Sequence, residues 1–100
     1  MINNEIVNDI KNHADNEGSG YRNWYCGITN DPDQRIFNDH NVPKGTNKAW
    51  WIKRNAGNEQ NARDTEDYLV QLGFDGGGKG GDYTTIHVYA YKKIPGITRE

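Results

Sequence analysis

Two segments of the chain carry hydrophobic residues at helical spacing. The first stripe comprises Ile2, Ile6, Val7 and Ile10. The second comprises Ala62, Thr65, Leu69 and Leu72. Recurrence every three or four residues predicts amphipathic helices over residues 3–14 and 59–72. Asn3 or Asn4 suits the N-cap of the first helix, and Gly73 suits the end of the second.

Alternation of side chains predicts three strands, over residues 23–29, 49–54 and 84–93. The core-facing positions are expected to be Trp24, Cys26 and Ile28, then Trp50 and Ile52, then Ile86, Val88 and Ala90. The opposite face receives Tyr25, Gly27 and Thr29, then Trp51 and Lys53, then His87, Tyr89 and Tyr91. Successive residues of a strand point to opposite faces, so the sequence predicts one apolar face and one face rich in tyrosine.

A third helix is predicted after the first strand. Asp31 suits its N-cap, Pro32 its first position, and Gln34 completes a capping-box pattern. We expect this helix to run to about His40 and to bury Ile36, Phe37 or both. Residues 74–82 (FDGGGKGGD) read as a flexible loop, and the tail from Pro95 is expected to fray.

The elements follow one another in the order α-β-α-β-α-β. This order predicts an α+β domain with a small mixed three-stranded sheet and three flanking helices. The length of 100 residues fits a single domain over residues 1–100, with an N-terminal helix over 1–15 and a core over 23–93.

Composition and charge narrow the possible functions. The formal net charge is −2, so the chain lacks the excess of Lys and Arg that non-specific nucleic-acid binding requires. A nucleic-acid role must therefore rest on a local basic surface, for which the candidates are Arg35, Lys53, Arg54, Arg63 and Lys79. Cys26 is the one cysteine and excludes an intrachain disulfide. The acidic N-terminus lacks the apolar region of a signal peptide, so we expect a cytoplasmic protein without a membrane partner.

A motif over the first strand and the following helix resembles a known family. Tyr25-Cys26-Gly27, then Thr29, then Arg35 is similar to the second signature of the GIY-YIG endonucleases, in which a Tyr-x-Gly strand leads into a helix bearing an arginine. Glu66 lies on the later helix where that family carries a glutamate, and WWIKR resembles the preceding strand. The resemblance covers roughly residues 24–72.

The resemblance implies phosphodiester hydrolysis in nucleic acid with one divalent metal ion. It implies that Glu66 binds Mg²⁺ or Mn²⁺, that a tyrosine such as Tyr25 helps to activate water, and that Arg35 contacts the phosphate. Gly27 lets a phosphate approach the backbone. The nucleic-acid contacts are then expected to include Gly27, Thr29, Lys53 and Lys79.

The sequence departs from the family at two places. The Gly-Ile-Tyr strand that should precede Tyr25 is replaced by ADNEGSG and a predicted helix. One hypothesis is that the last strand, with Tyr89 and Tyr91, pairs beside the Tyr25 strand and supplies the missing phenol, and Tyr89 is taken as the catalytic candidate. The family's helix histidine often comes four residues after the arginine. Asp39 holds that position here and the candidate His40 follows it, turned by a further 100° or so on an α-helix.

Simpler interpretations stay open for each of these residues. Tyr25 is an aromatic residue on a strand, where packing alone is a common reason for it. Gly27 fits a close contact with a neighbouring ring, and Arg35 with Asp39 fits an exposed i,i+4 ion pair. A second hypothesis is therefore a catalytically degenerate GIY-YIG-like fold that binds or inhibits a protein partner. The sequence leaves the oligomeric state open.

Overall fold

A mixed four-stranded sheet organises the protein in the computed structural model, which describes residues 1–18, 20–43, 50–76 and 82–99. The strands are β1 (Trp24–Thr29), β2 (Trp51–Asn55), β3 (Asp75–Gly76) and β4 (His87–Lys92), in the spatial order β2-β4-β1-β3. β4 runs antiparallel to both neighbours, and β3 runs parallel to β1. The α+β class and the mixed sheet are confirmed, whereas the predicted count of three strands is wrong.

The additional strand, β3, lies in the glycine-rich segment for which only a loop was expected. Gly76 has φ +144°, and a Cβ atom added to it would lie 2.2 Å from the carbonyl oxygen of Cys26. Only a residue without a side chain can therefore lie against β1 at this point. No side-chain alternation marks so short a strand, which is why the sequence pattern missed it.

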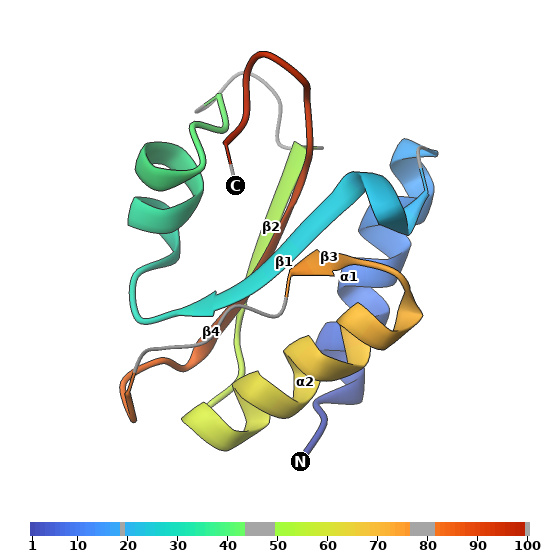
Figure 1. Ribbon diagram of the computed structural model, residues 1–100. Coiled ribbons are helices and arrows are strands. Elements are labelled where there is room, and N and C mark those ends of the chain that lie inside the picture. The colour runs from blue at the N-terminus through green and yellow to red at the C-terminus, as the bar shows by residue number, and fades with distance from the viewer. Residues whose placement is uncertain (19, 44–49, 77–81, 100) are drawn as a thin grey trace.

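Two α-helices cover one side of the sheet. They are α1 (Asn4–Glu17) and α2 (Glu59–Leu72), and Figure 1 shows both on the side away from the third helix. The side chain of Asn3 accepts a hydrogen bond from the backbone of Ile6 at 3.1 Å and caps α1. Asn58 caps α2 in the same way. Both helices agree with their predicted stripes to within three residues at each end.

The helices and the sheet enclose an apolar cluster. It contains Ile6, Val7, Ile10, Ala14, Trp24, Cys26, Ile52, Ala56, Ala62, Leu69, Phe74, Val88 and Ala90. The predicted core positions Trp24, Cys26, Val88 and Ala90 are therefore confirmed and Ile28 packs against them, whereas Ile86 lies before β4 and outside the cluster. Cys26 is fully buried here, and burial raises the pKa of its thiol well above the ordinary value.

The opposite side of the sheet carries the third helix, η2 (Gln34–Asp39), which follows the one-turn 3₁₀ helix η1 (Tyr21–Asn23) and β1 in the chain. The side chain of Asp31 accepts a hydrogen bond from the backbone of Gln34 at 3.1 Å, as a cap should. This helix is π-helical and not α-helical as expected. Its hydrogen bonds span five residues, a geometry that is rare and often occurs at functional sites.

A second cluster fills the space under η2. Its buried members are Ile36, Val42, Tyr89 and Tyr91, and Tyr25, Phe37, Trp50 and Trp51 pack against it. Trp50 was expected to share a face with Ile52, but it lies before the first residue of β2 and packs on this side instead. The tyrosine-rich face of the sheet is therefore also covered.

The C-terminal tail was expected to fray from Pro95, but its residues 97–99 make backbone hydrogen bonds. Ile97 and Thr98 close a turn on the carbonyl of Ile94, each at 3.0 Å. The backbone of Arg99 then donates to the carbonyl of His40, just after η2, at 2.7 Å. No helix among the described residues has the length and apolar character needed to cross a membrane.

Candidate active site

The glycine in the middle of β1 lies under a phenol ring. Gly27 is paired with Tyr89 across the antiparallel ladder, and Tyr25 with Tyr91. A Cβ atom added to Gly27 would lie 2.5 Å from the hydroxyl oxygen of Tyr89 and 2.6 Å from its ring. The close contact with a neighbouring ring is therefore present, and the space directly over Gly27 that was predicted for a phosphate is taken by Tyr89.

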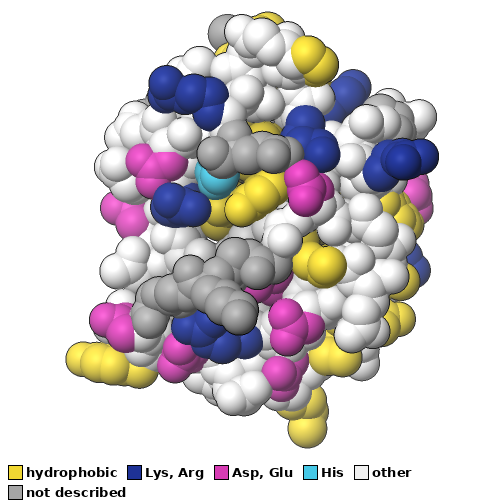
Figure 2. All heavy atoms as spheres, in the orientation of Figure 1, with side chains coloured by type: hydrophobic (Ala, Val, Ile, Leu, Met, Phe, Trp, Pro, Cys, Tyr) yellow, Lys and Arg dark blue, Asp and Glu magenta, His cyan; other side chains and the backbone are white. Residues whose placement is uncertain are grey.

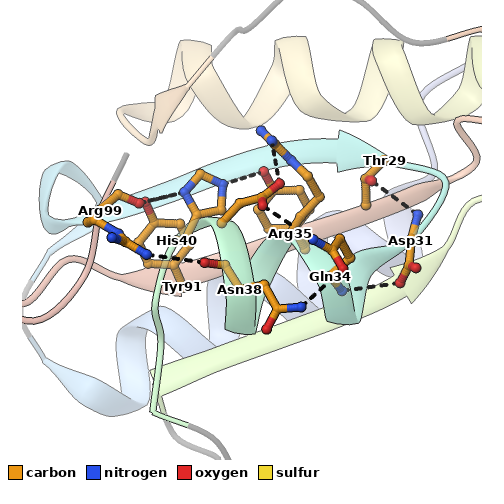
Figure 3. A network of polar contacts seen from close by, with 10 residues as sticks. Thr29, Asp31, Gln34, Arg35, Asn38, His40, Tyr91 and Arg99 are labelled. Carbon is orange, nitrogen blue, oxygen red and sulfur yellow. Dashed lines mark hydrogen bonds and ion pairs between the residues drawn. The ribbon is translucent and has the colours of Figure 1, made fainter.

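The π-helical turn brings Arg35 and His40 onto the same face of η2. The backbone N–H of His40 donates to the carbonyl of Arg35, five residues earlier, at 2.9 Å. On an α-helix a residue five positions later would point about 140° away from Arg35. The expectation that His40 is turned away from the arginine is therefore wrong, because the wider turn restores the alignment that the extra residue would have removed (Figure 3).

The imidazole of His40 contacts the hydroxyl group of Tyr89, and Arg35 acts on it electrostatically. The Nε2 atom of His40 lies 2.8 Å from that hydroxyl, and Tyr89 is 1% exposed. Burial raises the pKa of Tyr89 well above its ordinary value, although the charge of Arg35 and a hydrogen bond from it act in the opposite direction. The group is therefore a neutral phenol held between an imidazole and a guanidinium.

Tyr25 lies on the open side of this cluster. Its ring centroid is 5.0 Å from that of His40 and 5.3 Å from that of Tyr91, and the side chain is only half-buried. Burial raises the pKa of Tyr25, Arg35 lowers it and the charge of Glu66 raises it. Figure 2 shows a histidine beside hydrophobic side chains on this face of the molecule, with Lys or Arg side chains on either side.

Glu66 is a buried carboxylate and not the exposed surface residue that glutamates usually are. It lies on α2 and is 3% exposed. Its charge raises the pKa of Tyr25 and Tyr89 on one face of the sheet, and that of Cys26 on the other. The carboxylate of Glu66 is therefore within electrostatic range of groups on both faces of β1.

Arg35 also forms an ordinary ion pair with Asp39 on the same helix. Its guanidinium lies 2.9 Å from the carboxylate of Asp39, and both side chains are about 40% exposed (42% and 39%). The exposed i,i+4 ion pair that the sequence suggested is thus present, and Arg35 also contacts Tyr89 from the same position. The two interpretations of this arginine are compatible.

The predicted nucleic-acid contacts lie elsewhere. Thr29 is 7% exposed, and its hydroxyl accepts a hydrogen bond from the backbone of Asp31 at 3.1 Å, so it shapes the turn into η2. Lys53 forms an ion pair with Asp33. The structure does not bring these two side chains to the hydroxyl of Tyr89, and Lys79 lies outside the described residues.

The other basic side chains proposed for a local basic surface are paired too. Arg54 lies 3.1 Å from Asp9, and Arg63 lies 2.7 Å from Glu59. Each of the described candidates thus has a carboxylate beside it, which lowers the positive potential that the surface presents to a polyanion.

Two further residues, Asp75 and Arg99, join the site without having been singled out, and Tyr91 joins it beside the candidate phenol Tyr89. Asp75 pairs with Tyr25 in the sheet, and its charge contributes to raising the pKa of that phenol. The hydroxyl of Tyr91 lies 3.1 Å from Nδ1 of His40, and the backbone carbonyl of Arg99 lies 2.6 Å from the same nitrogen. The alternation of the last strand placed Tyr91 on the correct face, but no side-chain signal could have indicated a backbone carbonyl.

The geometry defines a small polar centre. The imidazole of His40 and the guanidinium of Arg35 act on the phenol of Tyr89. The phenol of Tyr25 and the buried carboxylate of Glu66 both raise the pKa of Tyr89, and Glu66 also raises that of Tyr25. Comparisons of the chain with protein-family models, with curated proteins and with solved structures found no match.

Proposed function

We propose that this protein is a metal-dependent nuclease of the GIY-YIG type that hydrolyses phosphodiester bonds in nucleic acid. The observation that carries the proposal is the meeting of Arg35 and His40, from one π-helical turn, at the hydroxyl of Tyr89. These residue types are the ones that phosphodiester hydrolysis needs, since it requires a proton acceptor and a cation near the phosphate.

The order of the strands supports a rearranged version of that fold. In the family the tyrosine strand precedes the Tyr-x-Gly strand, whereas here β4 comes last in the chain and lies antiparallel beside β1. Tyr89 and Tyr25 thereby become neighbours, with ring centroids 6.5 Å apart. In this proposal Tyr89 of β4 takes the place of the tyrosine of the missing first signature, although it comes later in the sequence.

Glu66 fits the divalent metal ion that the proposal requires. Among the described residues there is no group of three or more His, Cys, Asp or Glu side chains that could enclose a metal ion. Mg²⁺ does not need such a cage, because it retains several waters and is commonly held by one or two carboxylates together with substrate phosphates. A bound Mg²⁺ or Mn²⁺ would stabilise the negative charge that develops on the phosphate.

The protein's own residues provide a path for the proton of the attacking water. As the water oxygen forms its bond to phosphorus, its proton passes to the hydroxyl oxygen of Tyr89, whose own proton passes to Nε2 of His40. The opposite phosphorus–oxygen bond breaks, and the leaving oxygen takes a proton from solvent. This relay never requires a free phenolate, which the raised pKa of Tyr89 disfavours. In this scheme Arg35 would pair with a phosphate oxygen.

Hydrolysis of plasmid DNA and of RNA in the presence of Mg²⁺ or Mn²⁺ tests the proposal. The proposal predicts cleavage by the wild type, and loss of at least about 10²-fold in rate for Glu66→Gln. Glu59→Gln, on the same helix but in an ion pair with Arg63, is the matched control and should cleave like the wild type. No cleavage of either nucleic acid with either metal ion would contradict the proposal.

A catalytically degenerate scaffold that binds a protein is the second candidate. The pairing of Lys53, Arg54 and Arg63 with carboxylates favours it, because these side chains then attract nucleic acid only weakly. This candidate predicts no metal-dependent change of the amide signals near residues 25, 35 and 66. It also predicts a stable complex with a protein partner.

A further inference from the structure

The C-terminal segment is attached to the end of η2 by polar contacts along its length. The amide of Asn41 donates to the carbonyl of Ile97 at 2.8 Å, and the guanidinium of Arg99 donates to the carbonyl of Asn38 at 3.3 Å. The backbone N–H of Arg99 donates to the carbonyl of His40 at 2.7 Å. Figure 3 shows Arg99 beside His40 and Tyr91.

Apolar burial does not explain why this segment is held. Pro95, Gly96 and Ile97 are exposed, and Ile97 retains 40% of its accessible surface. The buried groups that the segment meets are the imidazole of His40 and the hydroxyl of Tyr91, both of which contact the carbonyl of Arg99. What the segment adds to the protein is therefore a hydrogen-bond acceptor at the candidate site.

That acceptor determines which nitrogen of His40 carries the hydrogen. The carbonyl oxygen of Arg99 can only accept hydrogen bonds, and it lies 2.6 Å from Nδ1, so Nδ1 must be the donor. Tyr91 donates to the same oxygen at 3.0 Å. In a neutral imidazole the other nitrogen is then an acceptor, and the hydroxyl of Tyr89, 2.8 Å from Nε2, must donate to it.

We infer that residues 97–99 form a positioning segment, in which the carbonyl of Arg99 holds His40 in the Nδ1–H tautomer so that Nε2 can receive the proton of Tyr89. The inference rests on the proposed nuclease function for its catalytic consequence. His40 and Tyr89 would take part in the proton transfer, whereas Arg99 and Tyr91 act only through His40. A change of tautomer would leave Tyr89 facing an N–H group, with no acceptor for its proton.

Nitrogen-15 NMR of the imidazole rings in the full chain, without metal ion or nucleic acid, tests the tautomer directly. The resonances of His40 are assigned by their absence in His40→Gln. We expect a single Nδ1–H tautomer in the wild type at pH 7.5 or so, and also in Arg99→Ala, which keeps the backbone N–H and carbonyl. Arg99→Pro removes the N–H that donates to His40, so we expect a mixture of tautomers.

Hydrolysis rates link the tautomer to the reaction. Arg99→Pro should lose about 10- to 100-fold in rate, and Arg99→Ala less than about threefold, because the displaced carbonyl and not the guanidinium matters. Tyr91→Phe retains the tautomer, since Nδ1 still donates to the carbonyl, and it provides a second variant if Arg99→Pro does not fold.

The outcomes separate this inference from the proposed function. An Nε2–H tautomer in the wild type, an unchanged tautomer in folded Arg99→Pro, or loss of the Nδ1–H tautomer in Tyr91→Phe overturns the positioning role. A single Nδ1–H tautomer in a wild type that cleaves neither DNA nor RNA overturns the nuclease proposal, and with it the catalytic consequence of the segment.

Discussion

The two faces of the sheet are built from alternate residues of the same strands, and they do different things. Trp24 and Cys26 of β1 point into an apolar cluster under α1 and α2, whereas Tyr25, one position along the strand from each, points to the opposite side. There the buried hydroxyl of Tyr89 is hydrogen-bonded to the buried imidazole of His40, and the partly exposed guanidinium of Arg35 acts on the same hydroxyl. The apolar face should govern stability, and the polar face should govern chemistry.

The largest effect on the polar face is expected from Tyr89→Phe. Removal of the hydroxyl interrupts the proposed proton path to His40, so the rate of hydrolysis should fall by about 10²- to 10⁴-fold. Tyr91→Phe, on the same strand and face, should lose less than about tenfold. Steady-state hydrolysis of DNA or RNA measures both. Equal losses for the two phenols would mean that Tyr89 has no special role.

Ile10→Ala is expected to give the largest effect on the apolar face. Ile10 lies on α1 and is fully buried, so its truncation should lower the free energy of unfolding by about 2–5 kcal/mol. Urea denaturation measures this loss. The rate of hydrolysis per folded molecule should stay within about twofold of the wild type, because α1 lies on the side of the sheet away from η2 (Figure 1). A specific loss of activity in folded Ile10→Ala would contradict the division of roles between the two faces.

Gly27→Ala should lower both the stability and the rate of hydrolysis, because the backbone of β1 contacts the ring of Tyr89 at Gly27. The added methyl group would overlap the phenol, which costs about 1–3 kcal/mol in stability, and would displace the hydroxyl from His40. A double-mutant cycle with Tyr89→Leu, measured by urea denaturation, isolates the contact. The cost of the alanine should be smaller in the Tyr89→Leu background, and an unchanged cost would contradict the close contact.

The smallest expected effect is the pH dependence that His40 adds to stability. Burial lowers the pKa of His40 below its ordinary value of 6.5, with Arg35 acting in the same direction and the carbonyl of Arg99 and the charge of Asp39 opposing it. The unfolded chain therefore binds the proton first as pH falls. His40 should make the folded protein less stable as pH drops below 6.5.

Comparison with His40→Gln isolates that contribution. The stability of the wild type should decline more steeply than that of the variant between about pH 7 and pH 5. Parallel curves for the two proteins in urea titrations at each pH would contradict a lowered pKa. Tyr25, Tyr89 and Tyr91 also face His40, but a neutral phenol does not titrate in this range.

Much of the fold could be predicted because it is recorded in side-chain patterns. The stripe of α2, the alternation of β4 and the cap at Asp31 each depend on residue types at fixed spacing, and each is present. The features that were missed depend on the backbone. β3 is two residues long, and the C-terminal tail is held largely through the backbone of Arg99.

In the candidate site, too, the residues recorded in side-chain spacing could be predicted and the features that depend on the backbone could not. Tyr25, Arg35 and Glu66 could be chosen from the sequence because their spacing resembles a known signature. Whether His40 lies beside these residues depends on a π-helical turn. The sequence of residues 34–39 does not predict that turn, since its pattern also fits an α-helix. Packing of Ile36 under the helix and the bond of His40 to Tyr89 are tertiary contacts, and they accompany the wider turn.

Paramagnetic broadening by Mn²⁺ is the most direct test of the central claim, that distant parts of the chain form one metal-dependent centre. Sub-stoichiometric Mn²⁺ added to the nitrogen-15-labelled protein should broaden amide signals around residues 25, 27, 66 and 89 together. Glu66→Gln should lose this broadening, and Glu59→Gln should keep it. Broadening confined to exposed carboxylates such as Asp9 or Asp15, or equal in wild type and Glu66→Gln, would contradict the account.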